Sequence, residues 1–127
     1  MASTQDTIAA LATPTGTAAI AVLRISGPDT ARITREIAGS LPPPRSAQRT
    51  DYHDAADNLL DDILLTFYQG PASYTGEDVL EISTHGNPYI AQRVLEDLIA
   101  RGCRMAEAGE FSQRAFLNGR MDLSQAE

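Results

Sequence analysis

The sequence contains no lysine, because its ten basic residues are all arginine. The phosphate-binding P-loop, G-x-x-x-x-G-K-[ST], needs a lysine, and so do enzymes that form a Schiff base with a carbonyl substrate. These 127 residues therefore hold neither a P-loop nucleotidase nor a Schiff-base enzyme. The arginines are outnumbered by 17 acidic residues, and the formal net charge is −7. This balance weighs against a domain whose main task is to grip nucleic acid, since phosphate contacts need a basic surface.

Cysteine is almost as scarce, with Cys103 as the single example. An intramolecular disulfide and a cysteine-based zinc site are therefore excluded, and we expect Cys103 to be a small buried side chain. The two histidines, His53 and His85, have no second histidine or cysteine nearby in the sequence, so no metal site is expected. Residues 1–7 lack the pattern of a signal peptide, and no apolar run approaches the ~18 residues that span a membrane. The expected location is the cytoplasm, with no membrane partner.

The pattern of apolar residues and turn residues predicts a mixture of strands and helices. Helices are expected over residues 28–37, 89–101 and 110–117, and strands over 7–13, 18–26, 52–56, 62–68, 79–84 and 103–107. The strand over 18–26 is apolar on both faces, which predicts a central strand covered on both sides. A hairpin turn near Asp57-Asn58 and the lack of regular βαβ alternation favour the α+β class, with a mixed β-sheet and flanking helices.

Two charged residues lie inside expected strands. Period-2 alternation places Glu81 opposite Leu80 and Ile82, so its carboxylate is either solvated or paired, or it receives N–H groups from a planar heterocycle. Arg24 ends a run that otherwise looks buried, and a buried charge needs a partner. That partner is either an internal carboxylate, with Glu81 as one candidate, or an anionic ligand.

The segment His85-Gly86-Asn87-Pro88 joins a strand to the clearest helix of the sequence. Its histidine either hydrogen-bonds the turn or acts as an acid or base near neutral pH. Glu77 and Asp78 follow Gly76, where a turn is favoured over a cation site. No serine stands in a G-x-S-x-G context, so no nucleophile elbow is expected.

Residues 122–127 resemble the start of a helix, with Asp122 as the cap and Gln125 in the capping-box position. Since a domain seldom ends in the first turns of a helix, we expect these residues to be part of a longer protein.

Three stretches resemble the family of bacterial tRNA-modification GTPases usually called MnmE or TrmE. The first is DTIAA at 6–10, with Thr13-Pro14 and LRISGP at 23–28. The second is GPASYTGEDVLE at 70–81 with His85-Gly86, and the third is AGEFSQRAFLNGRMDLSQAE at 108–127. Together they cover about half of the chain in the order and spacing of the family.

The resemblance implies a domain organisation and a function. Residues 1–119 would be an N-terminal folate-binding and dimerisation domain, similar in fold to the folate-binding domain of glycine-cleavage aminomethyltransferases. Residues 120–127 would begin the first helix of a central helical domain, into which the GTPase domain is inserted. GTP, Mg²⁺ and K⁺ would bind only in that GTPase domain, so this part of the chain should not hydrolyse GTP.

In the family, a homodimer holds a tetrahydrofolate derivative, 5-formyl- or methylene-tetrahydrofolate, at its interface. With a flavin-dependent partner protein, the full-length protein modifies carbon 5 of the wobble uridine of certain tRNAs. The alternatives are a purely structural dimerisation domain, with no folate bound by these residues, and a stand-alone folate-dependent transferase.

By motif, the family's folate contacts fall on Arg24, Glu81 and Arg120. Glu81 would accept N–H groups from the amino-pyrimidinone edge of the pterin, and the two arginines would face anionic or carbonyl groups. No catalytic residue is expected within the chain. Two departures from the family pattern stand out: Gly16-Thr17-Ala18-Ala19 replaces a turn with glycines and arginine, and Arg120 replaces a lysine that has different donor geometry.

Overall fold

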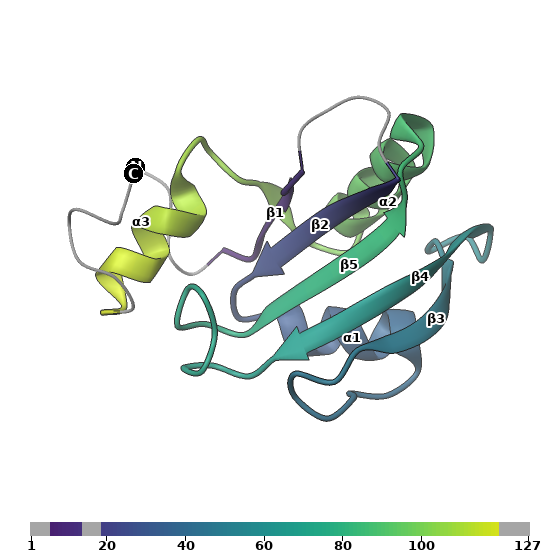
Figure 1. Ribbon diagram of the computed structural model, residues 1–127. Helices are drawn as coiled ribbons and strands as arrows, with labels where there is room; N and C mark the ends of the chain where they lie inside the picture. Colours follow the sequence, from purple (N-terminus) through teal and green to yellow (C-terminus); the bar gives the residue numbers. More distant parts are fainter. Residues whose placement is uncertain (1–5, 14–18, 120–127) are drawn as a thin grey trace.

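A computed structural model describes residues 6–13 and 19–119 of the protein. The chain forms a mixed sheet in the order β3-β4-β5-β2-β1-β6 (Figure 1). The strands are β1 (Ile8–Leu11), β2 (Ile20–Ser26), β3 (Gln48–His53), β4 (Leu59–Tyr68), β5 (Val79–His85) and β6 (Arg104–Met105). The helices are α1 (Thr30–Ala38), α2 (Pro88–Ala100) and α3 (Glu110–Leu117). All neighbouring strands are antiparallel except β1 and β6, which are parallel, so the predicted α+β class with a mixed sheet is confirmed.

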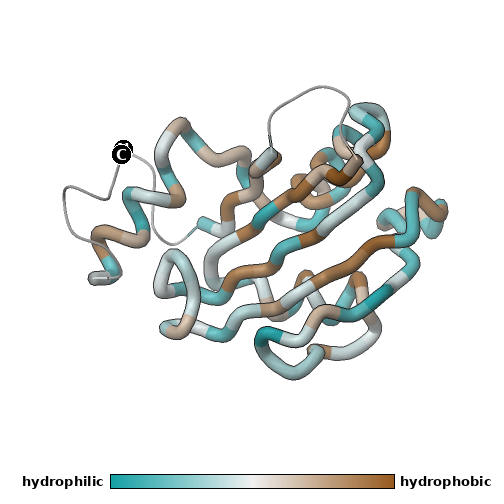
Figure 2. Tube along the Cα trace, viewed as in Figure 1, coloured by the Kyte–Doolittle hydropathy of each residue, from teal (hydrophilic) through white to brown (hydrophobic). Residues whose placement is uncertain are grey.

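Helices α1 and α2 pack on the same face of the sheet, which Figure 1 shows behind the strands. The core lies between these two helices and the sheet. Figure 2 shows the hydrophobic residues running along the strands. The core side chains alternate along each strand; those from the central strands are Leu23, Ile25, Ile63, Leu65, Phe67, Leu80 and Ile82. Burial of this apolar surface is the main favourable term in folding.

The opposite face of the sheet is open, which corrects the prediction that β2 is covered on both sides. Along β2, Leu23 is buried while Val22 and Arg24 are half-buried and Ile20 is 55% exposed. An apolar run on a strand indicates two covered faces only when helices lie on both sides of the sheet. In this protein α1 and α2 both lie on one side of the sheet.

The helix limits follow from local chemistry. The Asn87 side chain accepts a hydrogen bond from the backbone N–H of Tyr89 and so caps α2, with Pro88 at its first position. Gly102 follows the end of the helix and has a φ of +116°, a conformation that glycine adopts readily. Helix α3 has the predicted limits.

Strand β3 is shifted toward the N-terminus from the predicted 52–56 to Gln48–His53. The reason is Asp54, whose carboxylate accepts hydrogen bonds from the backbone N–H groups of Ala56 and Asn58. This local turn takes the chain out of the sheet before Ala55.

Within the described residues, none of the helices combines the length and the apolar character that crossing a bilayer demands.

Candidate functional site on the open face of the sheet

Arg24 and Glu81 face each other directly across β2 and β5 on the open face. Both the Nε and the Nη2 atoms of Arg24 donate to Oε2 of Glu81, at 3.0 and 2.8 Å. The two side chains are 28% and 30% exposed, so the pair is half-buried and open to solvent on one side. The sequence left an Arg24–Glu81 salt bridge as one of several possibilities, and the structure shows that it forms.

The carboxylate of Glu81 keeps acceptor capacity. Among the residues that the structure describes, its second oxygen, Oε1, receives only a long contact of 3.4 Å from the hydroxyl of Tyr68. A carboxylate has about four lone-pair sites, so Oε1 can accept further N–H groups. On the other partner, the Nη1 of Arg24 donates to no residue among those that the structure describes. The pair can therefore bind a ligand without first breaking.

Three aromatic rings border this ion pair. The guanidinium carbon of Arg24 lies 5.7 Å from the ring centre of Tyr74 and 6.0 Å from that of Phe111, within the range of cation–π attraction. Tyr68 lies next to Glu81, and burial together with the Glu81 carboxylate raises the pKa of the Tyr68 hydroxyl, which therefore stays a donor. An ion pair flanked by one exposed and two half-buried rings suits a flat ligand that carries both N–H groups and an apolar face.

Helix α3 brings Phe111 to the site, and a buried ionic network holds this helix in place. The α3 side chain Arg114 is 1% exposed. It donates to Glu77 in the loop before β5, to the α3 residue Glu110 and to the backbone carbonyl of Asp6. These bonds tie α3 to the loop that carries Tyr74, so the aromatic border depends on them.

The network continues on both sides of Arg114. The Ser26 hydroxyl, at the end of β2, donates to Glu77 at 2.7 Å. Arg104 donates to Glu110 at 2.7 Å. Burial would raise the pKa of Glu110, but hydrogen bonds from Arg104 and from the Glu107 backbone lower it to about 2. Glu110 is therefore ionised and holds both arginines.

His85 lies on the same face as Glu81, at the far end of β5. Its Nδ1 is 2.8 Å from Oδ1 of Asp61. This hydrogen bond is the main cause of the raised pKa of His85, and the negative charge of Asp61 is the second. The histidine therefore binds a β4 side chain, whereas the turn before α2 is capped by Asn87.

Of the three residues predicted to contact folate, the structure brings Arg24 and Glu81 together. Arg120 lies outside the described residues, as do residues 16–18 of the turn that differs from the family pattern. Asp78 accepts from the backbone N–H of Gly70 and so closes the loop over residues 70–78, rather than capping the turn at Gly76. The side chain of Glu77 joins the ionic network, while its backbone N–H donates to the Thr75 hydroxyl within the loop.

Tyr68, Tyr74 and Phe111 were not predicted from the sequence as neighbours of the pair. The available signal for Tyr68 was period-2 alternation in β4, which places it on the open face with Thr66, the cross-strand partner of Glu81. Tyr74 and Phe111 come from a loop and a separate helix, and no periodicity connects them to β2.

The architecture thus defines an α+β domain with one covered and one open sheet face, the open face carrying a half-buried ion pair under aromatic rings. Comparison with known proteins specifies the family. The chain belongs to the family described as "GTP-binding protein TrmE N-terminus", whose model matches residues 7–120.

Individual relatives agree with this family. The chain is 68% identical over 123 residues to the tRNA modification GTPase MnmE of Opitutus terrae, covering 97% of this chain and 27% of that protein. It is 52% identical over 122 residues to the protein of the same name from Halorhodospira halophila, covering 96% of this chain and 26% of that protein. The chain therefore spans about a quarter of the length of these relatives.

Proposed function

We propose that this chain is the part of a tRNA-modification GTPase that binds a tetrahydrofolate derivative and forms a homodimer. The observation that carries the proposal is the Arg24–Glu81 pair, half-buried on the open face and bordered by Tyr68, Tyr74 and Phe111. Both charged residues lie inside the segment that the family model covers.

The two residues of the pair suit two kinds of group in a folate: the N–H groups of the pterin, and the carbonyl and anionic groups. The free lone pairs of Glu81 accept N–H groups from the amino-pyrimidinone edge of the pterin, and such hydrogen bonds to a charged acceptor are the strong ones. The rings of Tyr74 and Phe111 offer apolar area to the flat ring system. Arg24, together with Arg120, serves the carbonyl and anionic groups. The ligand is 5-formyl- or methylene-tetrahydrofolate, and the role of these residues is binding.

The remaining steps of the proposed function belong to the longer protein. GTP, Mg²⁺ and K⁺ bind in its GTPase domain, and a flavin-dependent partner protein joins it to modify carbon 5 of the wobble uridine of tRNA in the cytoplasm. Residues 1–119 form the folate-binding domain, and residues 120–127 begin the central helical domain. Since the 127 residues contain no lysine, the purified chain should not turn over GTP, and turnover by clean protein would contradict this division of labour.

The folate proposal is tested with Glu81→Gln, which keeps the size of the side chain but replaces one acceptor oxygen with a donor. A hydrogen bond to a charged group contributes roughly 1.5–3 kcal/mol, so affinity for 5-formyl-tetrahydrofolate should fall about tenfold or more. Isothermal titration calorimetry measures the change. Glu96→Gln, an exposed glutamate on α2 on the covered side, is the matched control and should bind like wild type.

Circular dichroism must show that all three proteins are folded, because Glu81→Gln also removes the ion-pair partner of Arg24. Equal folate affinity in folded wild type and Glu81→Gln would remove Glu81 from the site.

The dimer proposal rests on the apolar part of the open face. Ile20 is 55% exposed and Leu64 is 51% exposed, on strands whose other side is the core. Exposed apolar side chains on an uncovered sheet face suit a second copy of the chain. Light scattering at micromolar concentration should report about twice the mass of 13.6 kDa.

Leu64→Asp should convert this dimer to a monomer, because the new carboxylate would be buried without a partner. Leu59→Asp is the matched control, since Leu59 is 60% exposed at the β3–β4 turn and away from the middle of the face. A Leu64→Asp protein that keeps the dimeric mass would place the interface elsewhere.

A purely structural dimerisation domain is the second candidate. The observation in its favour is that Glu81 already has internal partners, Arg24 and Tyr68. The two candidates separate in one experiment, since the structural domain would give the dimeric mass but no heat of binding with 5-formyl-tetrahydrofolate.

A further inference from the structure

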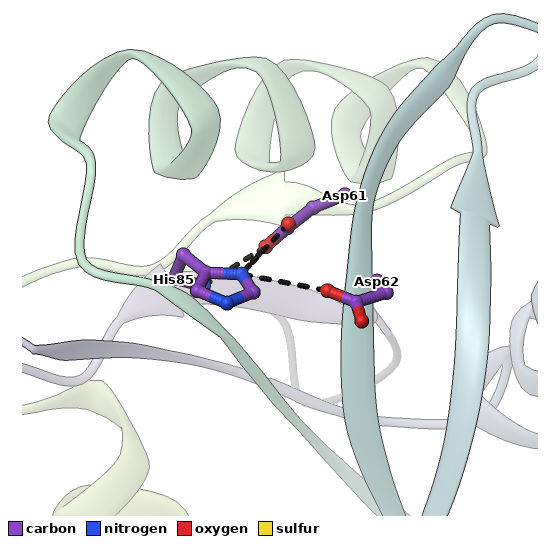
Figure 3. A group of neighbouring side chains, drawn as sticks. All are labelled: Asp61, Asp62 and His85. Atoms are coloured by element: carbon purple, nitrogen blue, oxygen red, sulfur yellow. Dashed lines mark hydrogen bonds and ion pairs between the residues drawn. The ribbon is translucent and has the colours of Figure 1, made fainter.

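Three potential metal ligands meet where β4 begins and β5 ends, at the far end of these strands from Arg24 and Glu81. They are Asp61 and Asp62 of β4 and His85 of β5, and Figure 3 shows the imidazole pointing between the two carboxylates. The His85 Nδ1 lies 2.8 Å from Oδ1 of Asp61 and 3.5 Å from Oδ1 of Asp62. One ligand atom from each residue lies within 4.8 Å of the others.

The end of the β4–β5 ladder explains how two consecutive aspartates approach one histidine. The last paired residues of β4 and β5 are Leu64 and Ser83, so Asp61 and Asp62 lie beyond this pairing, although both remain paired with β3. The backbone N–H of His85 donates to the Asp61 carboxylate at 2.8 Å instead of to a β4 carbonyl. A register shift between β3 and β4 at Tyr52/His53 also falls here, and such irregularities re-aim side chains.

The distances match those between neighbouring ligands of one metal ion. Zinc and similar ions bind imidazole nitrogen and carboxylate oxygen at about 2.0–2.2 Å, so adjacent ligands of a tetrahedral or octahedral ion lie about 3.0–3.5 Å apart. The observed separations of 2.8 and 3.5 Å bracket this range. Small rotations of the side chains would therefore admit an ion.

The surroundings supply two further features of a metal site. Asp61, whose side chain is only 9% exposed, is oriented by the His85 backbone N–H, which corresponds to the outer-shell hydrogen bonds that hold metal-binding carboxylates. Beside Asp62 and His85 is a cavity of about 270 Å³ with room for water on the metal, and it is also bordered by Ile20 and Leu64 of the proposed dimer face.

We propose that Asp61, Asp62 and His85 bind a first-row divalent transition-metal ion, such as Zn²⁺, Co²⁺ or Ni²⁺, with water completing the coordination. The imidazole ligand selects these ions over Mg²⁺ and Ca²⁺, which prefer oxygen ligands only. The sequence predicts no metal site because no second histidine or cysteine lies near His85 in the chain, whereas the fold brings two aspartates to it. The proposal is independent of folate binding.

One competitor for the site is visible. Arg49 of β3 donates to Asp62 Oδ2 at 3.1 Å, and its charge opposes that of a cation. Removing this arginine should therefore tighten metal binding, which a structural His–Asp contact alone would not require.

The test is a titration of the metal-stripped chain with Zn²⁺ at pH 7 by calorimetry. We expect one ion per chain, at least tenfold weaker binding in His85→Ala and in Asp62→Asn, and several-fold tighter binding in Arg49→Gln. His53→Ala is the matched control, because His53 is the only other histidine and is exposed on β3, and it should bind like wild type.

A second measurement does not depend on any variant. Co²⁺ added to the wild-type protein should shift and broaden the ring signals of His85 in the proton NMR spectrum far more than those of His53. The proposal is overturned if wild type takes up no ion at millimolar Zn²⁺, if folded His85→Ala binds as tightly as wild type, or if Co²⁺ leaves the His85 signals unchanged.

Discussion

Replacing the buried Arg114 by methionine tests whether ionic contacts hold α3 to the rest of the domain. Only Glu110, Arg114 and Ala115 are buried in this helix, so apolar packing contributes little to its docking. Arg114→Met keeps the aliphatic length and removes the charge that lies between Glu77 and Glu110. Both carboxylates would then face a partly buried site without their shared partner.

Breaking a buried ion pair by removing one partner costs about 3–5 kcal/mol. The lower end applies here, because the Glu77 side chain is 17% exposed and because Ser26 and Arg104 still bind the two carboxylates. We therefore expect Arg114→Met to lower the free energy of unfolding by about 3 kcal/mol.

Urea unfolding followed by circular dichroism at pH 7 measures this change. Arg35→Met, an exposed arginine on α1, is the matched control and should stay within about 0.5 kcal/mol of wild type. Adding Glu77→Gln to Arg114→Met should cost less than the sum of the two single changes, since the residues share one interaction. A loss below about 0.5 kcal/mol in Arg114→Met would refute the ionic docking of α3.

Lowering the pH tests the same ionic network through the protonation of Glu110. The folded-state pKa of Glu110 is lowered from 4.5 to about 2, so its contribution to stability is complete above about pH 4.5 and is lost as the pH falls toward 2. Urea midpoints between pH 5 and pH 2 should fall more steeply in wild type than in Glu110→Gln. Parallel curves for the two proteins would contradict this role.

Three further outcomes follow from other contacts. Tyr52→Phe removes the buried hydroxyl that donates to Asp97 at 2.6 Å, and should lower the free energy of unfolding by about 1.5–3 kcal/mol; urea midpoints within error of wild type would argue against the bond. Burial raises the pKa of Cys103 to about 12, so a thiol reagent at pH 8 should react with it only after unfolding, and rapid labelling of native protein would show that it is accessible. Asp61→Asn should lower the pKa of His85 in an NMR titration, because the hydrogen bond and charge of Asp61 raise it. The stability from protonated His85 is complete below pH 6.5 and is lost as the pH rises through the folded-state pKa. An unchanged titration would exclude Asp61 as the cause.

The sequence by itself determined the class of the fold and the local elements whose signals are short-range. The cap of α2, Asn87, and the residues at the two ends of α3, Gly109 and Asn118, are next to their helices in the chain. The alternation in β5 placed Glu81 away from the core side chains Leu80 and Ile82, as the structure has it. The absence of lysine excluded P-loop chemistry without any structure.

Only the tertiary structure decided which side of the sheet stays open and which residues meet there. Strand pairing brings Arg24 opposite Glu81 although 57 positions separate them, and that register depends on the whole sheet. Because α1 and α2 both lie on one face of the sheet, the other face of β2 is half-exposed, although its apolar run predicts two covered faces. Phe111 reaches Arg24 through the network around Arg114, and Asp61 reaches His85 where the β4–β5 ladder ends. Such contacts are long-range, and a periodicity read along the chain carries no information about them.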